Sequence, residues 1–130
     1  MHRVVLRTLV FDFAPDVHDA ARDFWGVALG AHVRRGVRYR EYHVLEHPAA
    51  LGSVMVQRLG EGSSRIHVDI ESDDTDAEVA RLVAVGAEVV ARIDDWTVLR
   101  DPAGLLFCVV PADPEGFAEA SRTVGTAAED

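Results

Sequence analysis

The strongest constraint on the fold is one short pattern that occurs in both halves of the chain. Residues 28–33 (ALGAHV) nearly match residues 84–89 (AVGAEV). Upstream, residues 10–13 (VFDF) parallel residues 67–70 (HVDI), and a helical pattern lies between the two segments in each half. Each half therefore predicts the order strand, helix, glycine turn and strand.

In the first half, the pattern predicts one strand, one helix and three further strands. Asp16 is the expected N-cap of the helix, with Phe24 facing the core and Trp25 at a module or dimer interface. Gly30 follows the helix, where a left-handed glycine commonly ends one. The expected strands of this half span residues 4–13, 32–35, 37–46 and 53–57.

The second half predicts the same order of elements. Either Asp74 or Thr75 caps its helix, and Thr75 with Glu78 fits a capping box. The segment DPAG at 101–104 predicts a turn before the last strand. The expected strands of this half span residues 65–70, 88–93, 96–100 and 105–110.

These elements predict an α+β fold of two tandem βαβββ modules in a single domain over residues 1–112. Module one is expected at 1–58 and module two at 63–112, with the linker at 59–62. Residues 113–130 are expected to form an acidic tail with one short helix that carries Phe117, followed by a frayed end.

Composition excludes several classes of partner and site. With a net charge of −9 and 48% hydrophobic residues, the chain is typical of a globular protein without affinity for nucleic acid or anionic membranes. No apolar run of about 18 residues is present to span a bilayer. A single cysteine, Cys108, excludes an internal disulfide and, with no signal peptide in view, indicates the cytoplasm.

Several segments resemble the vicinal oxygen chelate superfamily, in particular its glyoxalase-like domain branch. They are the Gly-Ala pair after each helix, the DPAG turn, and residues 10–12, 24–25, 65–69, 96–99 and 107–108. The superfamily includes glyoxalase I, bleomycin-resistance proteins and extradiol dioxygenases. The resemblance covers about residues 3–111 and implies a curved mixed sheet around a cavity for a small organic molecule, in a homodimer.

The resemblance also implies four positions for a metal ligand, which this sequence fills poorly. His67 matches one of them, whereas Val10 has no lone pair to offer. The position of the last-strand carboxylate falls on Cys108, and its counterpart in the first module falls on Met55, with Gln57 two residues further. Because a catalytic divalent ion generally needs three protein ligands, we expect no metal and no other cofactor.

Three residues are candidates for catalysis: His67, Asp69 and Asp12. Asp69 could hold one imidazole nitrogen of His67, although His67 could equally fill a polar cavity wall. Asp12 and Asp69 are equivalent in the repeat, so they could form an acid/base pair. The alternative is that each accepts hydrogen bonds from backbone or arginine and supports the fold.

A second set of residues is expected to contact a ligand. Tyr42 and Trp96 could stack on it, and Gln57 could donate to a ligand carbonyl, although each fits a structural role as well. For Cys108, a buried inert thiol is favoured over a nucleophile or ligand. For the arginines at 34, 35, 38 and 40, a solvated strand edge is favoured over a clamp for an anionic substrate. The full set of expected ligand contacts is Val10, Tyr42, Met55, Gln57, Trp96 and Cys108.

Three functions follow, in order of preference. The first is a metal-free protein that binds a small organic molecule in its cavity. The second is a metal-independent lyase or isomerase of a small carbonyl or polyketide-like compound, with His67, Asp12 and Asp69 moving protons. The third is a metal-dependent glyoxalase or dioxygenase.

Overall fold

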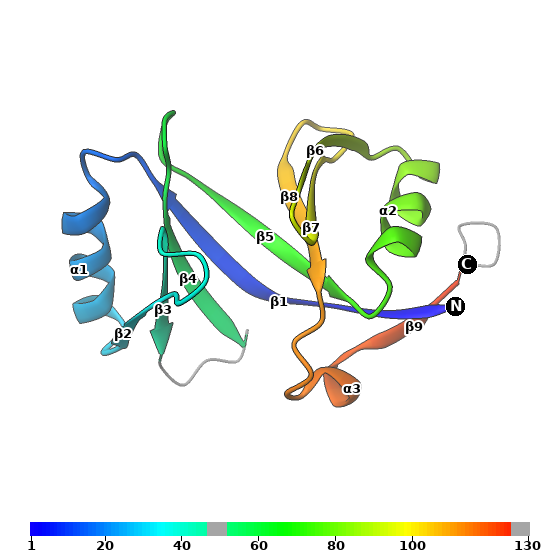
Figure 1. The fold of residues 1–130 in the computed structure, drawn as a ribbon, viewed down its shortest axis with the longest axis horizontal. Helices are drawn as coiled ribbons and strands as arrows, with labels where there is room; N and C mark the ends of the chain where they lie inside the picture. The colour runs from blue at the N-terminus through cyan, green and yellow to red at the C-terminus, as the bar shows by residue number, and fades with distance from the viewer. Residues whose placement is uncertain (47–51, 126–130) are drawn as a thin grey trace. The chain divides into compact units, whose positions relative to one another are not determined.

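The computed structural model describes residues 1–46 and 52–125, which form two compact units (Figure 1). The first unit is Thr8–His67. The second unit combines Met1–Arg7 with the described residues from Val68 onward. The boundaries fall inside strands β1 and β5, so each of these strands contributes residues to both units.

The first unit contains one helix and a four-stranded mixed sheet. Its strand order is β2-β3-β4-β1, in which β1 and β4 are parallel and the other pairs antiparallel. Strand β3 is shorter than predicted, because a turn leads into its first residue, Tyr42. In that turn the Gly36 N–H donates to the Tyr42 carbonyl, and the Tyr42 N–H donates to the Tyr39 carbonyl. The elements are β1 (His2–Phe13), α1 (His18–Ala28), β2 (His32–Arg35), β3 (Tyr42–Glu46) and β4 (Ser53–Arg58).

The second unit repeats this arrangement. Its strand order is β5-β8-β7-β6, with β5 and β8 parallel, and β9 pairs with the beginning of β1. The elements are β5 (Arg65–Ser72), α2 (Thr75–Ala84), β6 (Glu88–Ile93), β7 (Trp96–Arg100), β8 (Leu106–Pro111), α3 (Phe117–Ala120) and β9 (Arg122–Val124). The predicted α+β class and the twofold strand, helix and three-strand order are thereby confirmed. No helix within 1–46 and 52–125 is long and apolar enough to cross a membrane.

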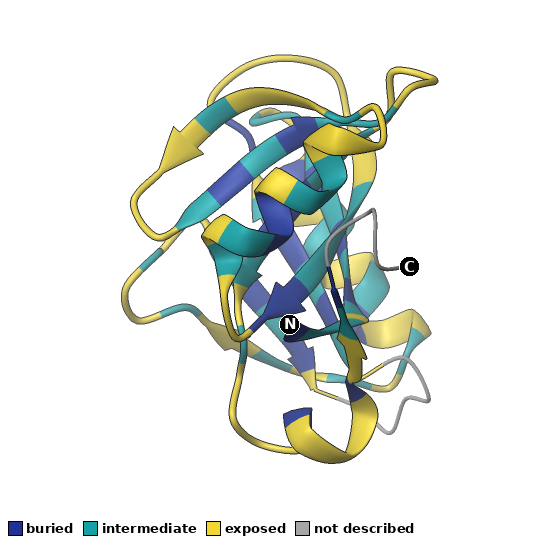
Figure 2. Cartoon of the chain, turned by 90° about the vertical axis from the view of Figure 1, so that its right-hand side faces the viewer, coloured by how far each residue is buried: buried dark blue, intermediate teal, exposed yellow. Residues whose placement is uncertain are grey.

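In each unit the helix packs on one face of the sheet (Figure 1). The core under α1 is built on Leu45, Val54 and Val56, and that under α2 on Val79, Leu99 and Val109. Figure 2 shows the burial that results: several strands carry buried residues, whereas the outward turns of the helices are exposed, as is most of edge strand β6. Because strand side chains alternate, the other residues of these strands point away from the helix, and we call that side the helix-free face.

The prediction for the two aromatic residues of α1 is wrong. Trp25 packs against the core and stacks on Phe11 with ring centroids 4.8 Å apart, whereas Phe24 is 63% exposed. Buried Gly26 sets this orientation, since a Cβ there would stand 2.9 Å from Val33. Asp16 is not the cap either, because the N-cap is Val17 and no side chain accepts a capping hydrogen bond.

Helix α2 begins at the first of the two predicted caps. The Asp74 carboxylate accepts a hydrogen bond from the backbone of Ala77 at 3.0 Å. The capping box is wrong, because Glu78 is fully buried and is bound instead by His2 at 2.9 Å and by Arg81. A buried carboxylate needs such partners, and sequence spacing alone did not indicate them.

The tail is more ordered than predicted. The short helix α3 carries Phe117 as expected, but β9 follows where a frayed end was predicted. Arg3 donates to the side chains of Ser121 and Thr123, each at 2.8 Å, which ties this segment to β1. The last five residues of the predicted tail, 126–130, lie outside the described part of the chain.

Two histidines, the first residue of α1 and one residue of β3, are buried side by side. His18 and His43 are 2% and 9% exposed, with ring centroids 5.5 Å apart. Within the described residues, His18 Nε2 and His43 Nδ1 have no hydrogen-bond partner. Burial lowers the pKa of His43, and the positive charges of Arg22 and Arg35 and its neighbour His18 lower it further, against a smaller opposing effect of Asp19.

This pair predicts that acid destabilises the first unit. The unfolded chain takes up a proton at His43 as the pH falls through about 6.5, whereas the folded chain resists it, so stability is lost below that pH. We expect the free energy of unfolding in urea to fall less steeply with acidification in His43→Leu than in wild type. Replacing the exposed His32 by Leu is the control. An unchanged pH slope in His43→Leu would contradict the prediction.

Candidate functional site

The predicted site residues of the first unit lie together on its helix-free face. The strand register pairs Asp12 with Gln57 and Gln57 with Tyr42, so these three side chains form a polar row across β1, β4 and β3. The next row contains Val10 and Met55. Val10 is fully buried, whereas Tyr42, Met55 and Gln57 are half-buried and accessible to a ligand.

The central feature of the site is a hydrogen bond between Asp12 and His67. His67 Nδ1 lies 2.5 Å from Asp12 Oδ2, and Asp12 is only 2% exposed. With Asp12 ionised, Nδ1 carries the proton and donates, which leaves the basic lone pair on Nε2. The second carboxylate oxygen, Asp12 Oδ1, is buried and has no hydrogen-bond partner among the described residues.

The structure adds a partner for His67 that the sequence did not indicate. The sequence offered Asp69 as a partner for one imidazole nitrogen, and Asp12 occupies Nδ1. Asp12 reaches His67 from another strand, β1, whereas Asp69 shares one face of β5 with it.

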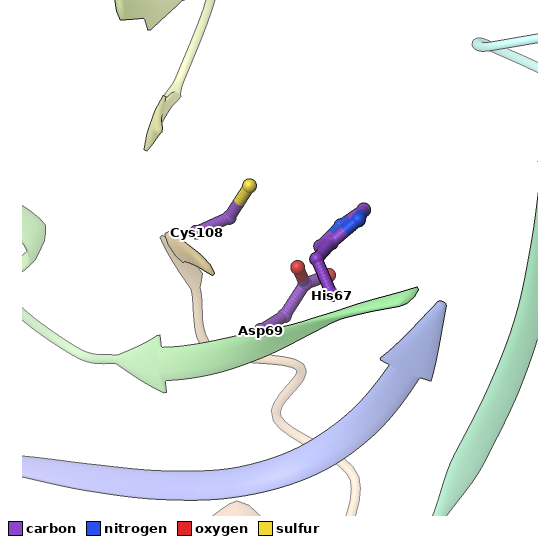
Figure 3. Close-up of side chains that lie close together, drawn as sticks. All are labelled: His67, Asp69 and Cys108. Carbon is purple, nitrogen blue, oxygen red and sulfur yellow. The ribbon is translucent and has the colours of Figure 1, made fainter. Parts of the chain in front are cut away.

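Asp69 contributes to a second cluster with His67 and Cys108. Asp69 stands opposite Cys108 in the β5–β8 register, and His67 precedes it by two residues on β5. One potential ligand atom from each of the three residues lies within 4.8 Å of the others. Figure 3 shows the three side chains on the same side of these strands.

This cluster fits a zinc-type ion in its donor chemistry. It offers nitrogen, oxygen and sulfur donors, the set that zinc accepts. Ligand atoms around tetrahedral zinc stand roughly 3.3–3.8 Å apart, so small side-chain movements would close the set. Asp12 behind His67 matches the carboxylate that commonly supports a zinc-bound histidine. The sequence argument found too few donors because Asp69 stands at none of the positions that the resemblance implies.

The register also corrects the correspondence between the two modules. Asp12 pairs with Gln57 in the same way as its repeat equivalent, Asp69, pairs with Cys108. Gln57, and not Met55, is therefore the first-module counterpart of Cys108. Cys108 itself is 8% exposed, in agreement with a buried thiol.

Trp96 is half-buried and lies on the helix-free face of the second unit. It precedes Val98 by two residues on β7, and Val98 pairs with Cys108. The arginine-rich hairpin has local partners, as expected of a solvated edge. Arg34 forms an ion pair with Glu46, and Arg35 donates to a backbone carbonyl of the hairpin.

One charged residue of the site was not predicted. Arg65 Nε lies 4.0 Å from Asp12 Oδ2, and the Arg65 side chain is 46% exposed. Arg65 precedes His67 by two residues on β5, so the period-two pattern of this strand places both on the same face. The period-two pattern could have placed Arg65 on the face of His67, but it does not reveal that the Arg65 guanidinium approaches Asp12.

Sequence comparison now identifies the family. Residues 8–110 match the glyoxalase-like domain. The chain belongs to the glyoxalase-like domain family. No curated protein matches the sequence significantly.

Solved structures similar to this glyoxalase-like protein share its fold. Methylmalonyl-CoA epimerase from Mycobacterium tuberculosis superposes with a TM-score of 0.58 at 17% identity, covering 87% of this chain and 91% of the epimerase. A glyoxalase/bleomycin resistance protein/dioxygenase superfamily member from Vibrio splendidus 12B01 gives 0.51 at 18% identity, with coverages of 81% and 97%. A putative dioxygenase from Bacillus subtilis gives 0.57 at 13% identity, and the match covers 86% of this chain but only 43% of the dioxygenase. These superpositions confirm the predicted glyoxalase/bleomycin-resistance-type fold. At such low sequence identities they do not indicate a particular activity.

Proposed function

We propose that this chain binds a small carbonyl compound on its helix-free face and moves a proton with His67, as a metal-independent lyase or isomerase. The observation that carries the proposal is the hydrogen bond from His67 Nδ1 to the buried Asp12 carboxylate. A histidine that only lines a pocket does not need an ionisable group buried behind it. A general base does, because the carboxylate fixes the tautomer and stabilises the imidazolium that forms.

In this proposal, each step falls to a residue of the first unit. His67 Nε2 accepts a proton from the carbon next to the substrate carbonyl, and Asp12 stabilises the resulting positive charge. Negative charge then develops on the carbonyl oxygen, to which the Gln57 amide and the Tyr42 hydroxyl of the same polar row can donate. His67 returns the proton to carbon in an isomerisation, or the enolate expels a leaving group in a lyase reaction.

The fold supports this reaction class without fixing the substrate. A protein of the same fold is an epimerase whose substrate, methylmalonyl-CoA, is itself a carbonyl compound. The helix-free face of the first unit combines the half-buried, apolar Met55 with the polar row beside it. Such a surface suits a small molecule with one apolar part and one carbonyl group.

The proposed role of the Asp12–His67 dyad predicts that variants of either residue lose proton transfer without an equal loss of ligand binding. We expect His67→Gln and Asp12→Asn to reduce turnover by about 10²–10⁴ while ligand affinity changes only modestly. Small carbonyl compounds are first screened by thermal shift. Exchange of their α-protons in D₂O is then followed by NMR, with His32→Gln as the control. Exchange that survives His67→Gln would contradict the assignment, and tight binding without conversion of any compound would favour a binding protein.

A metal-dependent reaction is the second candidate, because His67, Asp69 and Cys108 could hold a zinc-type ion. Such an ion would polarise the substrate carbonyl as a Lewis acid. We favour the metal-independent reaction because the first module offers no strong metal ligand at the two positions in question. Val10 has no lone pair, and Gln57, the counterpart of Cys108, has only a neutral amide.

Metal content separates the two candidates. The metal-independent proposal predicts far less than one zinc, nickel, iron or manganese per chain after mild purification, and full activity after treatment with a chelator. Elemental analysis makes the measurement. About one metal per chain, lost in Cys108→Ser and Asp69→Asn but retained in His32→Gln, would establish the metal-dependent alternative.

We also propose that the protein is a cytoplasmic homodimer. Helix α1 exposes an apolar side, on which Phe24 and Val27 are 63% and 84% exposed. We expect a sedimentation mass of about twice 14.2 kDa at micromolar concentration, reduced to one chain in Phe24→Asp. Leu105→Asp, at an exposed position of the second unit, is the control. A wild-type mass near 14.2 kDa would contradict the proposal.

A further inference from the structure

The guanidinium of Arg65 lies beside the Asp12–His67 dyad, which does not engage all of its hydrogen-bond donors. Its Nε lies 4.0 Å from Asp12 Oδ2, which is beyond hydrogen-bond distance. The oxygen it approaches already accepts the short hydrogen bond from His67. Its Nη1 donates a long hydrogen bond, 3.4 Å, to the backbone carbonyl of Ser63. A guanidinium carries five N–H donors, so this half-exposed side chain retains donors for a ligand.

The charges of the site change when the reaction begins. Before proton transfer, the negative Asp12 and the positive Arg65 balance each other across a neutral His67. After His67 accepts a proton, the three side chains carry one net positive charge. The enolate that forms in the same step carries the negative charge that offsets this excess. A substrate carboxylate is an additional negative charge, present before the reaction, and the guanidinium of Arg65 is the positive group beside the dyad that can pair with it.

We propose that Arg65 binds a carboxylate of the substrate, so that the site acts on small oxo acids in preference to neutral carbonyl compounds. The inference rests on the proposed function of the Asp12–His67 dyad. The planar fork of a guanidinium matches a carboxylate with two parallel N–H donors, which a lysine cannot reproduce. Arg65 and His67 share one face of β5, two residues apart, so a carboxylate held by Arg65 places the adjoining carbon chain along the strand toward His67.

The competing role for Arg65 is purely structural, as a positive charge that offsets the buried Asp12. Removing a structural charge would perturb the dyad for every ligand alike. Removing a carboxylate anchor would weaken only ligands that carry the carboxylate. The charge of the probe therefore separates the two roles.

The experiment compares 2-oxobutyrate with its neutral amide, 2-oxobutanamide, which has nearly the same size and shape. Dissociation constants are measured by NMR titration, and exchange of the C3 protons in D₂O reports proton transfer. In that exchange His67 removes a proton from C3 and returns a deuteron acquired from solvent. Homologous 2-oxo and 3-oxo acids with their amides extend the series.

We expect wild type to bind the acids at least tenfold more tightly than the amides. Arg65→Gln should weaken the acids by roughly 10–100-fold and change the amides by less than twofold, because it removes hydrogen bonds to a charged group. Arg65→Lys should restore only part of the affinity for the acids. Arg92→Gln, at an exposed arginine of the second unit, should leave both classes unchanged.

Three results would overturn the inference: equal binding of acids and amides by wild type, an equal loss of both classes in Arg65→Gln, or no binding of any acid in the series. Failure of the proposed function gives a different result. If acids bind selectively through Arg65 but no C3 proton exchanges, the dyad assignment fails and the carboxylate site stands. If amides exchange as readily as acids, the dyad stands and the role of Arg65 fails.

Discussion

The buried carboxylate of Asp12 is the constraint on which the site depends. Removing a carboxylate from water costs several kcal/mol unless hydrogen bonds and opposite charge compensate it. Here His67 supplies a short hydrogen bond and Arg65 a nearby positive charge, both from β5. The same contacts that stabilise Asp12 fix the orientation of the imidazole. In the proposed function, the stability of the first unit and the orientation of its base therefore have one physical origin.

The internal repeat explains why a reactive surface exists beside a stable core. In each module the helix covers one face of the sheet and supplies the apolar contacts. The residues that alternate with this core are left to face away from the helix, where polar side chains are tolerated and accessible. The two modules then diverged at equivalent positions: Val10 stands where the second module has His67, and Gln57 where it has Cys108. In the proposed function, the base His67 and Asp12, which orients it, therefore stand at positions that are not equivalent in the repeat.

Periodicity predicted the fold well because burial of strands and helices follows from patterns of two and 3.6 residues. Periodicity did not predict the orientation of α1. Phe24 and Trp25 are adjacent, and the close approach of Val33 to Gly26 decides which of the two faces the core. The buried partners of Glu78 and the pairing of β9 also escaped, because they depend on side chains distant in sequence. For the site, repeat equivalence indicated Asp12 and Asp69, and the family resemblance indicated His67. Their contacts could not be derived, because register between distant strands decides that Asp12 binds His67 and that Asp69 meets Cys108.

The tautomer of His67 tests the central claim most directly, because it needs no knowledge of the substrate. Long-range ¹H–¹⁵N correlation spectra of the labelled protein distinguish a protonated from an unprotonated ring nitrogen. At mildly alkaline pH we expect a protonated Nδ1 and an unprotonated Nε2 for His67, with this preference lost in Asp12→Asn and retained in Asp69→Asn. A proton on Nε2 in wild type, or a tautomer indifferent to Asp12→Asn, would contradict the account.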